Sequence, residues 1–417
     1  MLNIKLVDSC RERFMRSLLV VCPLVITMAV TACGAAPPEP VHSARLQALL
    51  EKGVAMGYPG MAFLIEDGKG NIQSAAAGYA NLEYRIPMDV GNGFHIASIN
   101  KAFTAAATLH LVDEGKLSLN ATLVEVLGSA VARVPNSDRI TVAQLLDHSS
   151  GIYATNNDMD YLSTLLGPKA DPKRVWTPVE LVALADKDRQ RPSGEPGSGH
   201  YYSDTNYVLL GMIVAKVSGV PFKDFVKNTF FKPLRMDSTY FYTDYLAGQV
   251  KPRMEATQGY LVASNDIRGL IDINPMFKPV PGGKRGGDEL LNTTLAAERV
   301  DAAGGIVTTM GDLAKFASPL YRGKLLSPKS QAFLEAALQG SGTLPIDKHL
   351  TWTLQAMRKP YGTLIYKEGD GAGGVNTLMA YLPARDEIFI GFSNSFGFFN
   401  EVDFMMDDVI GPWVANN

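Results

Sequence analysis

The stretch His95-Ile96-Ala97-Ser98-Ile99-Asn100-Lys101-Ala102-Phe103-Thr104 leads into an apolar helix expected to reach Glu114. A serine and a lysine three residues apart share one face of a helix, so the Ser98 hydroxyl and the Lys101 amine can meet. A helix N-terminus also carries partial positive charge that favours a developing anion. Nucleophilic catalysis needs this set of a hydroxyl, a base and a supporting field. Taken alone, the pair is more often a helix cap followed by a solvated lysine.

Strand-like segments lie at both ends of the chain, far from this helix in sequence. Residues 61–66 and 71–77 read as a hairpin, and residues 377–382 and 387–393 read as another. The long middle is mostly helical in pattern. We therefore predict an α/β (α+β) fold in which one antiparallel sheet is built from both termini and flanked by helices, with a mostly helical lobe beside it.

Composition and charge describe an ordinary folded chain. The 417 residues are 46% hydrophobic, and 39 Lys and Arg face 42 Asp and Glu, for a net charge of −3. Such a composition excludes wholesale disorder. A near-balanced charge gives no electrostatic reason to expect a nucleic-acid partner, which usually requires a clustered basic surface.

The N-terminus resembles a bacterial lipoprotein signal. The apolar run of residues 18–30 is short of the roughly 20 residues that a membrane span needs, and small residues before Cys33 suit a cleavage site. The run is preceded by the basic residues Lys5, Arg11, Arg13 and Arg16. We expect a signal peptide over 1–32, a lipidated Cys33 and tether over 33–43, and the folded domain over 44–417. The lipid would anchor the protein in the bacterial cell envelope, at the periplasmic face of the outer membrane in a Gram-negative source.

The cysteines and histidines limit the kinds of catalytic and metal-binding site that the chain can form. The chain has three cysteines, at positions 10, 22 and 33, so cleavage before Cys33 leaves no pair for a disulfide and no second thiol. The six histidines lack metal-binding spacing, and no nucleotide-binding loop is present. We expect no metal and no cofactor, and catalysis that depends on Ser, Lys, Tyr or carboxylate groups.

Further motifs follow Ser98 and Lys101 in a fixed order. They are LVDEGKLSL (111–119), LLDHSSGI (145–152), YSDTNYVLLG (202–211), ATQGY (256–260) and GGIVTT (304–309). In this order the chain resembles the serine β-lactamase-related family, which includes class C β-lactamases, D-alanyl-D-alanine carboxypeptidases, D-aminopeptidases and esterases. The resemblance covers about residues 44 to 395.

The resemblance implies acyl transfer through a covalent serine ester. Ser98 would be the nucleophile, Lys101 would take its proton, and Tyr202 would carry a proton to the leaving group and back from water. The Ser98 backbone N–H would form part of an oxyanion hole. By the same resemblance, His148 is expected to be structural.

Asp204 departs from the commonest form of the family's tyrosine motif, in which this residue is Asn. A carboxylate accepts hydrogen bonds from Lys101 but cannot donate one to a substrate carbonyl. It would also stabilise the protonated form of Lys101. Asp204 therefore argues against the amide recognition of β-lactamases.

The third motif departs further. The family places a cation, in Lys-Thr-Gly or His-x-Gly, on the strand that lines the site, and this chain has KEGDGAGGV over 367–375. Counted back from Tyr381, the cation position falls on Glu368, Asp370 or Gly371, and Lys367 lies one residue too early. An acidic group there would repel a substrate carboxylate.

Small residues in the same motif still let a backbone N–H approach an oxyanion. The expected substrate-binding residues are Asp204, Asp370, Gly371 and Gly373. These features favour esters, amides or cationic substrates over penicillins and D-alanyl-D-alanine ends.

The expected function is that of an envelope-anchored serine hydrolase acting on a small ester, amide or peptide, as an esterase or D-aminopeptidase does. One alternative is a D-alanyl-D-alanine carboxypeptidase or β-lactamase, for which Lys284 or Arg285 would have to supply the cation. The other is an envelope binding lipoprotein that keeps the fold without turnover.

Overall fold

The computed structural model describes residues 41–165, 170–171, 173–186, 188, 192–251, 257–262, 278–285, 288–293, 300–338, 354–371, 373–397 and 401–416. The expected signal peptide (1–32) and Cys33 lie outside these residues. Residues 38–417 group into one unit.

One large sheet joins the two ends of the chain. Its order is β1-β3-β2-β14-β13-β12-β11, with β4 added to β3. β14 pairs with β2 antiparallel, with Ile390 opposite Leu64, and this pairing brings the N-terminal hairpin beside the C-terminal one. The strands are β1 (Val41–His42), β2 (Gly60–Glu66), β3 (Ile72–Asn81), β4 (Ile86–Pro87), β11 (Gln355–Lys359), β12 (Gly362–Gly371), β13 (Val375–Leu382) and β14 (Glu387–Ser393). The antiparallel sheet predicted from both termini is confirmed.

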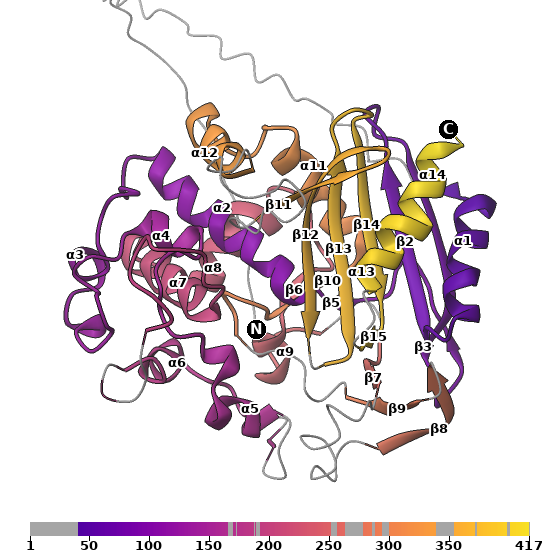
Figure 1. Cartoon of the computed structure of the whole chain (residues 1–417), viewed down its shortest axis with the longest axis horizontal. Coiled ribbons are helices and arrows are strands. Elements are labelled where there is room, and N and C mark those ends of the chain that lie inside the picture. The colour runs from indigo at the N-terminus through magenta and orange to yellow at the C-terminus, as the bar shows by residue number, and fades with distance from the viewer. Residues whose placement is uncertain are drawn as a thin grey trace, which may run out of the picture. The chain divides into compact units, whose positions relative to one another are not determined.

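Terminal helices cover one face of this sheet (Figure 1). They are α1 (Ala44–Ala55), α13 (Glu401–Asp403), a π-helix (Phe404–Ile410) and α14 (Gly411–Ala415). Met405 and Met406 are fully buried there against α1 and the strands. The burial of these apolar side chains against the sheet stabilises the layer.

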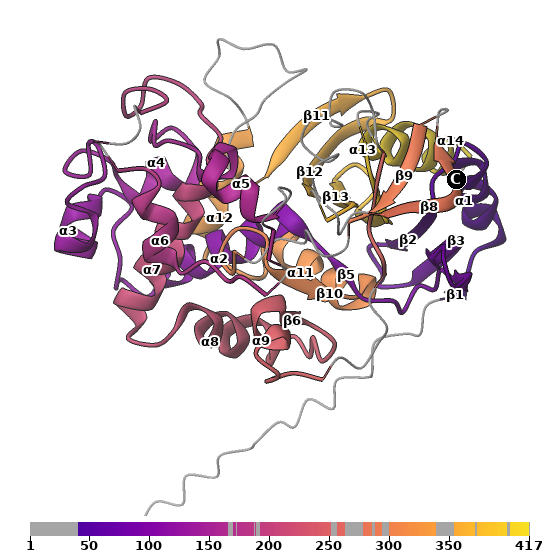
Figure 2. The ribbon, with the colours of Figure 1, turned by 90° about the horizontal axis from the view of Figure 1, so that it is seen from below.

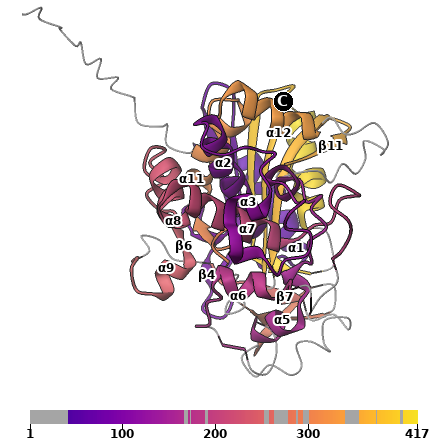
Figure 3. The same ribbon diagram turned by 90° about the vertical axis from the view of Figure 1, so that its left-hand side faces the viewer.

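The opposite face of the sheet carries the helical lobe (Figures 2 and 3). Its central helices α2 (Asn100–Asp113) and α7 (Asp204–Ser218) are buried nearly all round and pack against each other. α7 ends at Gly219, whose φ of 77° is the left-handed conformation that glycine adopts at helix ends. Around them lie α3 (Leu123–Leu127), α4 (Val142–Leu146), α5 (Met159–Leu165), α6 (Pro178–Ala183), α8 (Phe222–Val226), α9 (Tyr242–Leu246), α11 (Met310–Tyr321) and α12 (Pro328–Leu338).

Two small sheets complete the frame around the start of α2. One has the order β5-β10-β6, and the other β15-β7-β9-β8. The strands are β5 (Phe94–His95), β6 (Tyr240–Phe241), β7 (Tyr260–Val262), β8 (Lys278–Arg285), β9 (Asp288–Asn292), β10 (Ile306–Thr308) and β15 (Ser395–Phe396). Lys284, the alternative source of a cation, lies exposed on β8.

No helix among the described residues has the length and apolarity to cross a bilayer. No group of three or more His, Cys, Asp or Glu side chains among them gathers as metal ligands would.

Candidate active site

Ser98 lies in a single 3₁₀ turn (Ala97–Ile99) immediately before α2. The turn is held from behind, because Ile96 N–H donates to Ile306 O of β10 at 3.1 Å. Ala97 has a φ of 42°, a left-handed conformation that costs free energy for a residue with a side chain. The half-buried Ser98 is thus presented at the N-terminal end of a long helix.

Lys101 connects the serine to two other segments. It is fully buried, and its Nζ donates to Ser98 Oγ at 2.8 Å and to Ala303 O at 3.0 Å. The same Nζ lies 2.8 Å from Asp204 Oδ1. An ammonium group, with three N–H donors, suits such a set of acceptors.

Tyr202 approaches the serine from the segment before α7. Its Oη shares a hydrogen bond of 2.8 Å with Ser98 Oγ, whereas the residue as a whole is 39% exposed. Burial of the hydroxyl raises the pKa of Tyr202 to about 12, partly offset by the positive charge of Lys101. At neutral pH Tyr202 is therefore a neutral phenol that can donate or relay a proton.

His148 supports this arrangement through packing. Its buried ring lies 4.5 Å from the Tyr202 ring, centre to centre. Nδ1 accepts from the backbone N–H of Ser203 at 3.2 Å and lies 3.0 Å from the Asn206 side-chain amide. Burial holds the pKa of His148 well below its usual value, so the ring is neutral. Its contacts position the Tyr202 segment, in line with the structural role expected from the sequence.

The structure therefore brings together Ser98, Lys101, Tyr202 and Asp204, four of the residues singled out from the sequence. Asp204 is the first residue of α7, and its side chain is 11% exposed at the ion pair with Lys101. The Asp204 carboxylate thus faces the Lys101 amine, as the sequence predicts.

Lys367 corrects the sequence-based view of the third motif. It lies on β12, is only 2% exposed, and its Nζ is 5.6 Å from the centre of the Tyr202 ring. The expectation that no cation stands at this position is wrong. Burial lowers the pKa of Lys367 to about 8, and the charge of Lys101 adds to the effect. The nearby carboxylates of Glu368, Asp204 and Asp370 act in the opposite direction and favour the charged form of Lys367.

The error arose from the strand register. Counting along the loop did not account for pairing, in which Lys367 faces Met379 and Gly369 faces Thr377. Lys367 and Gly369 are two residues apart, so their Cβ positions lie on the same face of β12. The Lys-x-Gly pattern of Lys367-Glu368-Gly369 was the signal that could have identified the cation. Glu368, between them, lies on the opposite face of β12, and burial raises the pKa of its carboxyl.

Gly369 lets β12 lie against the turn that carries Ser98. A Cβ at this position would be 2.2 Å from Ile96 O and 3.0 Å from Ile99 N. Thr377 stabilises the same contact, because its Oγ1 lies 3.2 Å from Ile96 O and 3.0 Å from Gly369 O. The close approach of strand to turn therefore depends on the absence of a side chain.

The remaining predicted residues lie where β12 ends. Asp370 is exposed, and partial desolvation raises the pKa of its carboxyl, while Lys101 and Lys367 lower it. Gly371 is the last residue of β12. Gly373 lies in the following turn, where its carbonyl would meet a Cβ placed at Gly259. Asp370 thus adds negative charge near the two lysines, whereas Gly373 serves the packing of the turn.

We predict that Gly369→Ala separates β12 from the Ser98 turn. The rate of covalent labelling of Ser98 by a fluorophosphonate should fall about 100-fold, because a misplacement of about 1 Å is enough for such a loss. Gly311→Ala is the matched control, since a Cβ there meets nothing within 4 Å. An unchanged labelling rate in a folded Gly369→Ala protein would show that the close approach is not needed.

Comparison with known proteins agrees with this geometry. The sequence profile of the Beta-lactamase family matches residues 46–407. Penicillin-binding protein 4* of Bacillus subtilis (strain 168) is 26% identical over 307 residues, which cover 72% of this chain and 60% of that protein. A second relative from the same strain is 26% identical over 275 residues, 58% of its length. The chain thus spans about three fifths of the length of these curated relatives.

Solved structures share the fold. D-amino acid amidase from Ochrobactrum anthropi SV3, complexed with D-phenylalanine, superposes with a TM-score of 0.71 at 24% identity and covers 89% of this chain and 99% of that one. A penicillin-binding protein from Bacillus halodurans gives a TM-score of 0.67 at 24% identity, over 90% and 100% of the two chains. With the profile match over most of the described domain, the chain belongs to the β-lactamase family.

Proposed function

We propose that this chain is a serine hydrolase that cleaves an amide or ester through a covalent acyl-Ser98 intermediate. The observation that carries the proposal is the position of Ser98 Oγ, which lies 2.8 Å from both Lys101 Nζ and Tyr202 Oη. A nucleophile in hydrogen-bond contact with two proton-carrying groups has the geometry that acyl transfer needs.

The proton movements follow from these contacts. Ser98 Oγ attacks the carbonyl carbon when Lys101 is in its neutral form, and the serine proton passes to Nζ. Repulsion from Lys367 favours that neutral form, whereas Asp204 opposes it. Tyr202 gives its proton to the departing amine or alkoxide, and Lys101 Nζ then passes to the Tyr202 oxygen the proton that it took from Ser98. A water molecule then attacks the acyl-enzyme, and the reversed transfers restore Ser98.

The position of Lys367 favours a second candidate function, which uses the same acyl-serine mechanism. Its buried ammonium beside Tyr202 could pair with a substrate carboxylate, as a D-alanyl-D-alanine carboxypeptidase or β-lactamase requires. With Lys367 beside Tyr202, the lack of a cation no longer counts against such substrates. The exposed Asp370 at the end of the same strand still favours substrates that also carry a cationic or neutral group.

Parallel labelling with a fluorophosphonate and a fluorescent penicillin tests both candidates. We predict that the fluorophosphonate labels the domain from Gly34 onward and that Ser98→Ala abolishes the labelling. Labelling by penicillin as well would establish the carboxylate-reading candidate. Absence of labelling by either reagent would leave the non-catalytic binding lipoprotein as the better account.

Two lysine substitutions, compared in the same labelling experiment, test which lysine supplies the cation for a substrate carboxylate. Lys367→Gln should reduce penicillin labelling and leave fluorophosphonate labelling, which needs no carboxylate, largely intact. Lys284→Gln, at an exposed lysine of β8, is the matched control and should change neither. Loss of penicillin labelling in Lys284→Gln would return the role to the β8 hairpin.

The pH dependence follows from the lowered pKa of Lys367, about 8. The charge of Lys367 is present below this pH and is lost as the pH rises through it. We predict that the ratio of penicillin to fluorophosphonate labelling rates falls between about pH 7 and pH 9, by about tenfold per unit once above the pKa. The ratio cancels titration of Lys101, which both reagents share. A flat ratio in the native protein, or the same slope in Lys367→Gln, would contradict this assignment.

We also propose that the mature chain is anchored to the cell envelope by lipid on Cys33. The support is the sequence alone, a basic segment and an apolar run that end in small residues at a cysteine. In a bacterial host the full chain should partition into detergent after phase separation, and Cys33→Ser should move it to the aqueous phase. Partition of Cys33→Ser with the detergent would refute lipidation at this residue.

A further inference from the structure

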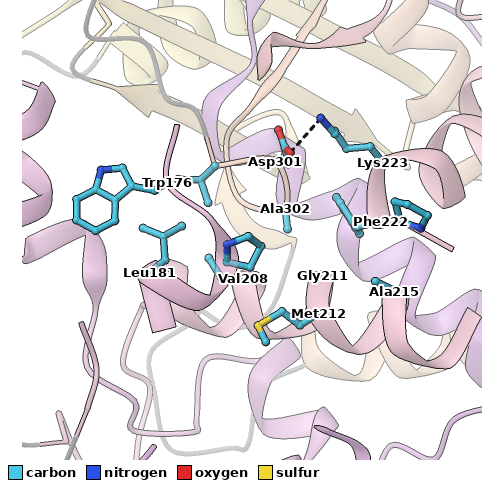
Figure 4. Close-up of a pocket in the computed structure, with 13 residues that line it drawn as sticks. Trp176, Leu181, Val208, Gly211, Met212, Ala215, Phe222, Lys223, Asp301 and Ala302 are labelled. Carbon is cyan, nitrogen blue, oxygen red and sulfur yellow. Dashed lines mark ion pairs between the residues drawn. The ribbon is translucent and has the colours of Figure 1, made fainter. Parts of the chain in front are cut away.

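A pocket of about 250 Å³ lies between α6, α7, α8 and residues 300–302 (Figure 4). Apolar side chains make most of its wall, among them Trp176, Leu181, Met212 and Phe222. Lys223 and Asp301 lie together at one end. Ser98, Lys101, Tyr202 and Lys367 are not among its lining residues.

The pocket and the catalytic site are different places on the same helix. Asp204 begins α7 at the active site, whereas the pocket meets α7 at Gly211 and Ala215. Seven residues of helix correspond to about 10 Å along its axis. A Cβ at Gly211 would be 2.7 Å from Ala302 Cβ, so this glycine sets the close distance between α7 and residues 300–302.

The size and charge of the pocket define what would fit. A cavity of about 150 Å³ holds a benzene molecule, so about 250 Å³ holds a ring with a short substituent. Lys223 Nζ lies 3.6 Å from Asp301 Oδ2, longer than a hydrogen bond, and 2.6 Å from Asp244 Oδ1. Lys227 pairs with the other Asp244 oxygen at 2.5 Å, so Lys223 and Lys227 balance Asp301 and Asp244 at this end of the pocket, while Asp224, 4.0 Å from Lys227, is 55% exposed to solvent.

A balanced group of charges gives little reward for a ligand with net charge, which would lose its own hydration on entry. A hydroxyl or amide can instead bridge this pair from the pocket side, donating to Asp301 Oδ2 and accepting from Lys223 Nζ. The ring would meanwhile replace water against the apolar wall.

Residues 301–303 join this pocket directly to the catalytic lysine. The carbonyl of Asp301 accepts from the Asn100 side chain at 2.7 Å, and that of Ala302 accepts from Thr104 Oγ1 at 2.7 Å. The next carbonyl, of Ala303, accepts from Lys101 Nζ at 3.0 Å. A ligand that presses on Asp301 and Ala302 therefore acts on the segment that holds Lys101.

We propose that this pocket is a second ligand site, for neutral ring compounds that carry one hydroxyl or amide, and that its occupancy alters the reactivity of Ser98. The binding half of the proposal is independent of hydrolase activity, and the reactivity half rests on the function proposed above.

The binding experiment uses benzyl alcohol as the probe, with benzoate and benzylammonium as charged analogues of similar size. Titrations of the full chain by ligand-observed NMR should show that benzyl alcohol binds more tightly than either ion. Ala215→Leu, which fills the pocket, should weaken binding by at least about tenfold. Ala183→Leu, on the exposed side of α6, is the matched control and should bind as the native protein does. Equal binding in Ala215→Leu, or tighter binding of an ion, would overturn the proposal.

A second measurement locates the probe without crowding the pocket. Benzyl alcohol should change the fluorescence of Trp176, and Trp176→Phe should remove that change. A change that persists in Trp176→Phe would place the probe elsewhere.

The reactivity half is measured by the rate of fluorophosphonate labelling of Ser98. Saturating benzyl alcohol should change this rate in the native protein and in Ala183→Leu, and should not change it in Ala215→Leu. An unchanged rate in the native protein would overturn the link to Lys101. Absence of labelling under all conditions would instead contradict the proposed hydrolase function and leave the binding result standing.

Discussion

The buried amine of Lys101 is the point on which the catalytic arrangement depends. Its contacts join Ser98 at the start of α2, Asp204 at the start of α7 and Ala303 before β10. Removal of one partner of a buried ion pair leaves an uncompensated charge and typically costs about 3–5 kcal/mol. The three segments are therefore held in register by the same group that would activate the serine, and stability and catalysis are coupled at this residue.

The large sheet also supports the catalytic arrangement, through β12. β12 reaches the Ser98 turn only because Gly369 lacks a side chain, and it carries Lys367 to the Tyr202 ring on the same face. The order β2-β14-β13-β12 ties that strand to the N-terminal hairpin. The site thus lies where a strand from the C-terminal third meets a helix from the first third, which explains why both ends of the chain are needed to build it.

Local patterns predicted the parts of the site that depend on local structure. The spacing of Ser98 and Lys101 determines which helix face they share, and the two side chains meet at 2.8 Å as expected. The position of Lys367 depends on the pairing of β12 with β13, which loop counting cannot recover. The same limit applies to the pocket beside α7, because its walls come from four separated segments and no periodicity in the sequence records their meeting.

The two departures from the family's motifs are Asp204 and the third motif around Lys367, and their charges act on each other. With Asn at position 204, Lys101 would lose its ion-pair partner, and only Glu368 and Asp370 would offset the repulsion between Lys101 and Lys367. Asp204 neutralises Lys101 and raises the pKa of Lys367 against the lowering effect of burial. The aspartate that seemed to oppose catalysis by stabilising the Lys101 ammonium thereby helps to keep Lys367 charged near neutral pH. One carboxylate therefore acts on both lysines, as the ion-pair partner of Lys101 and as a negative charge near Lys367.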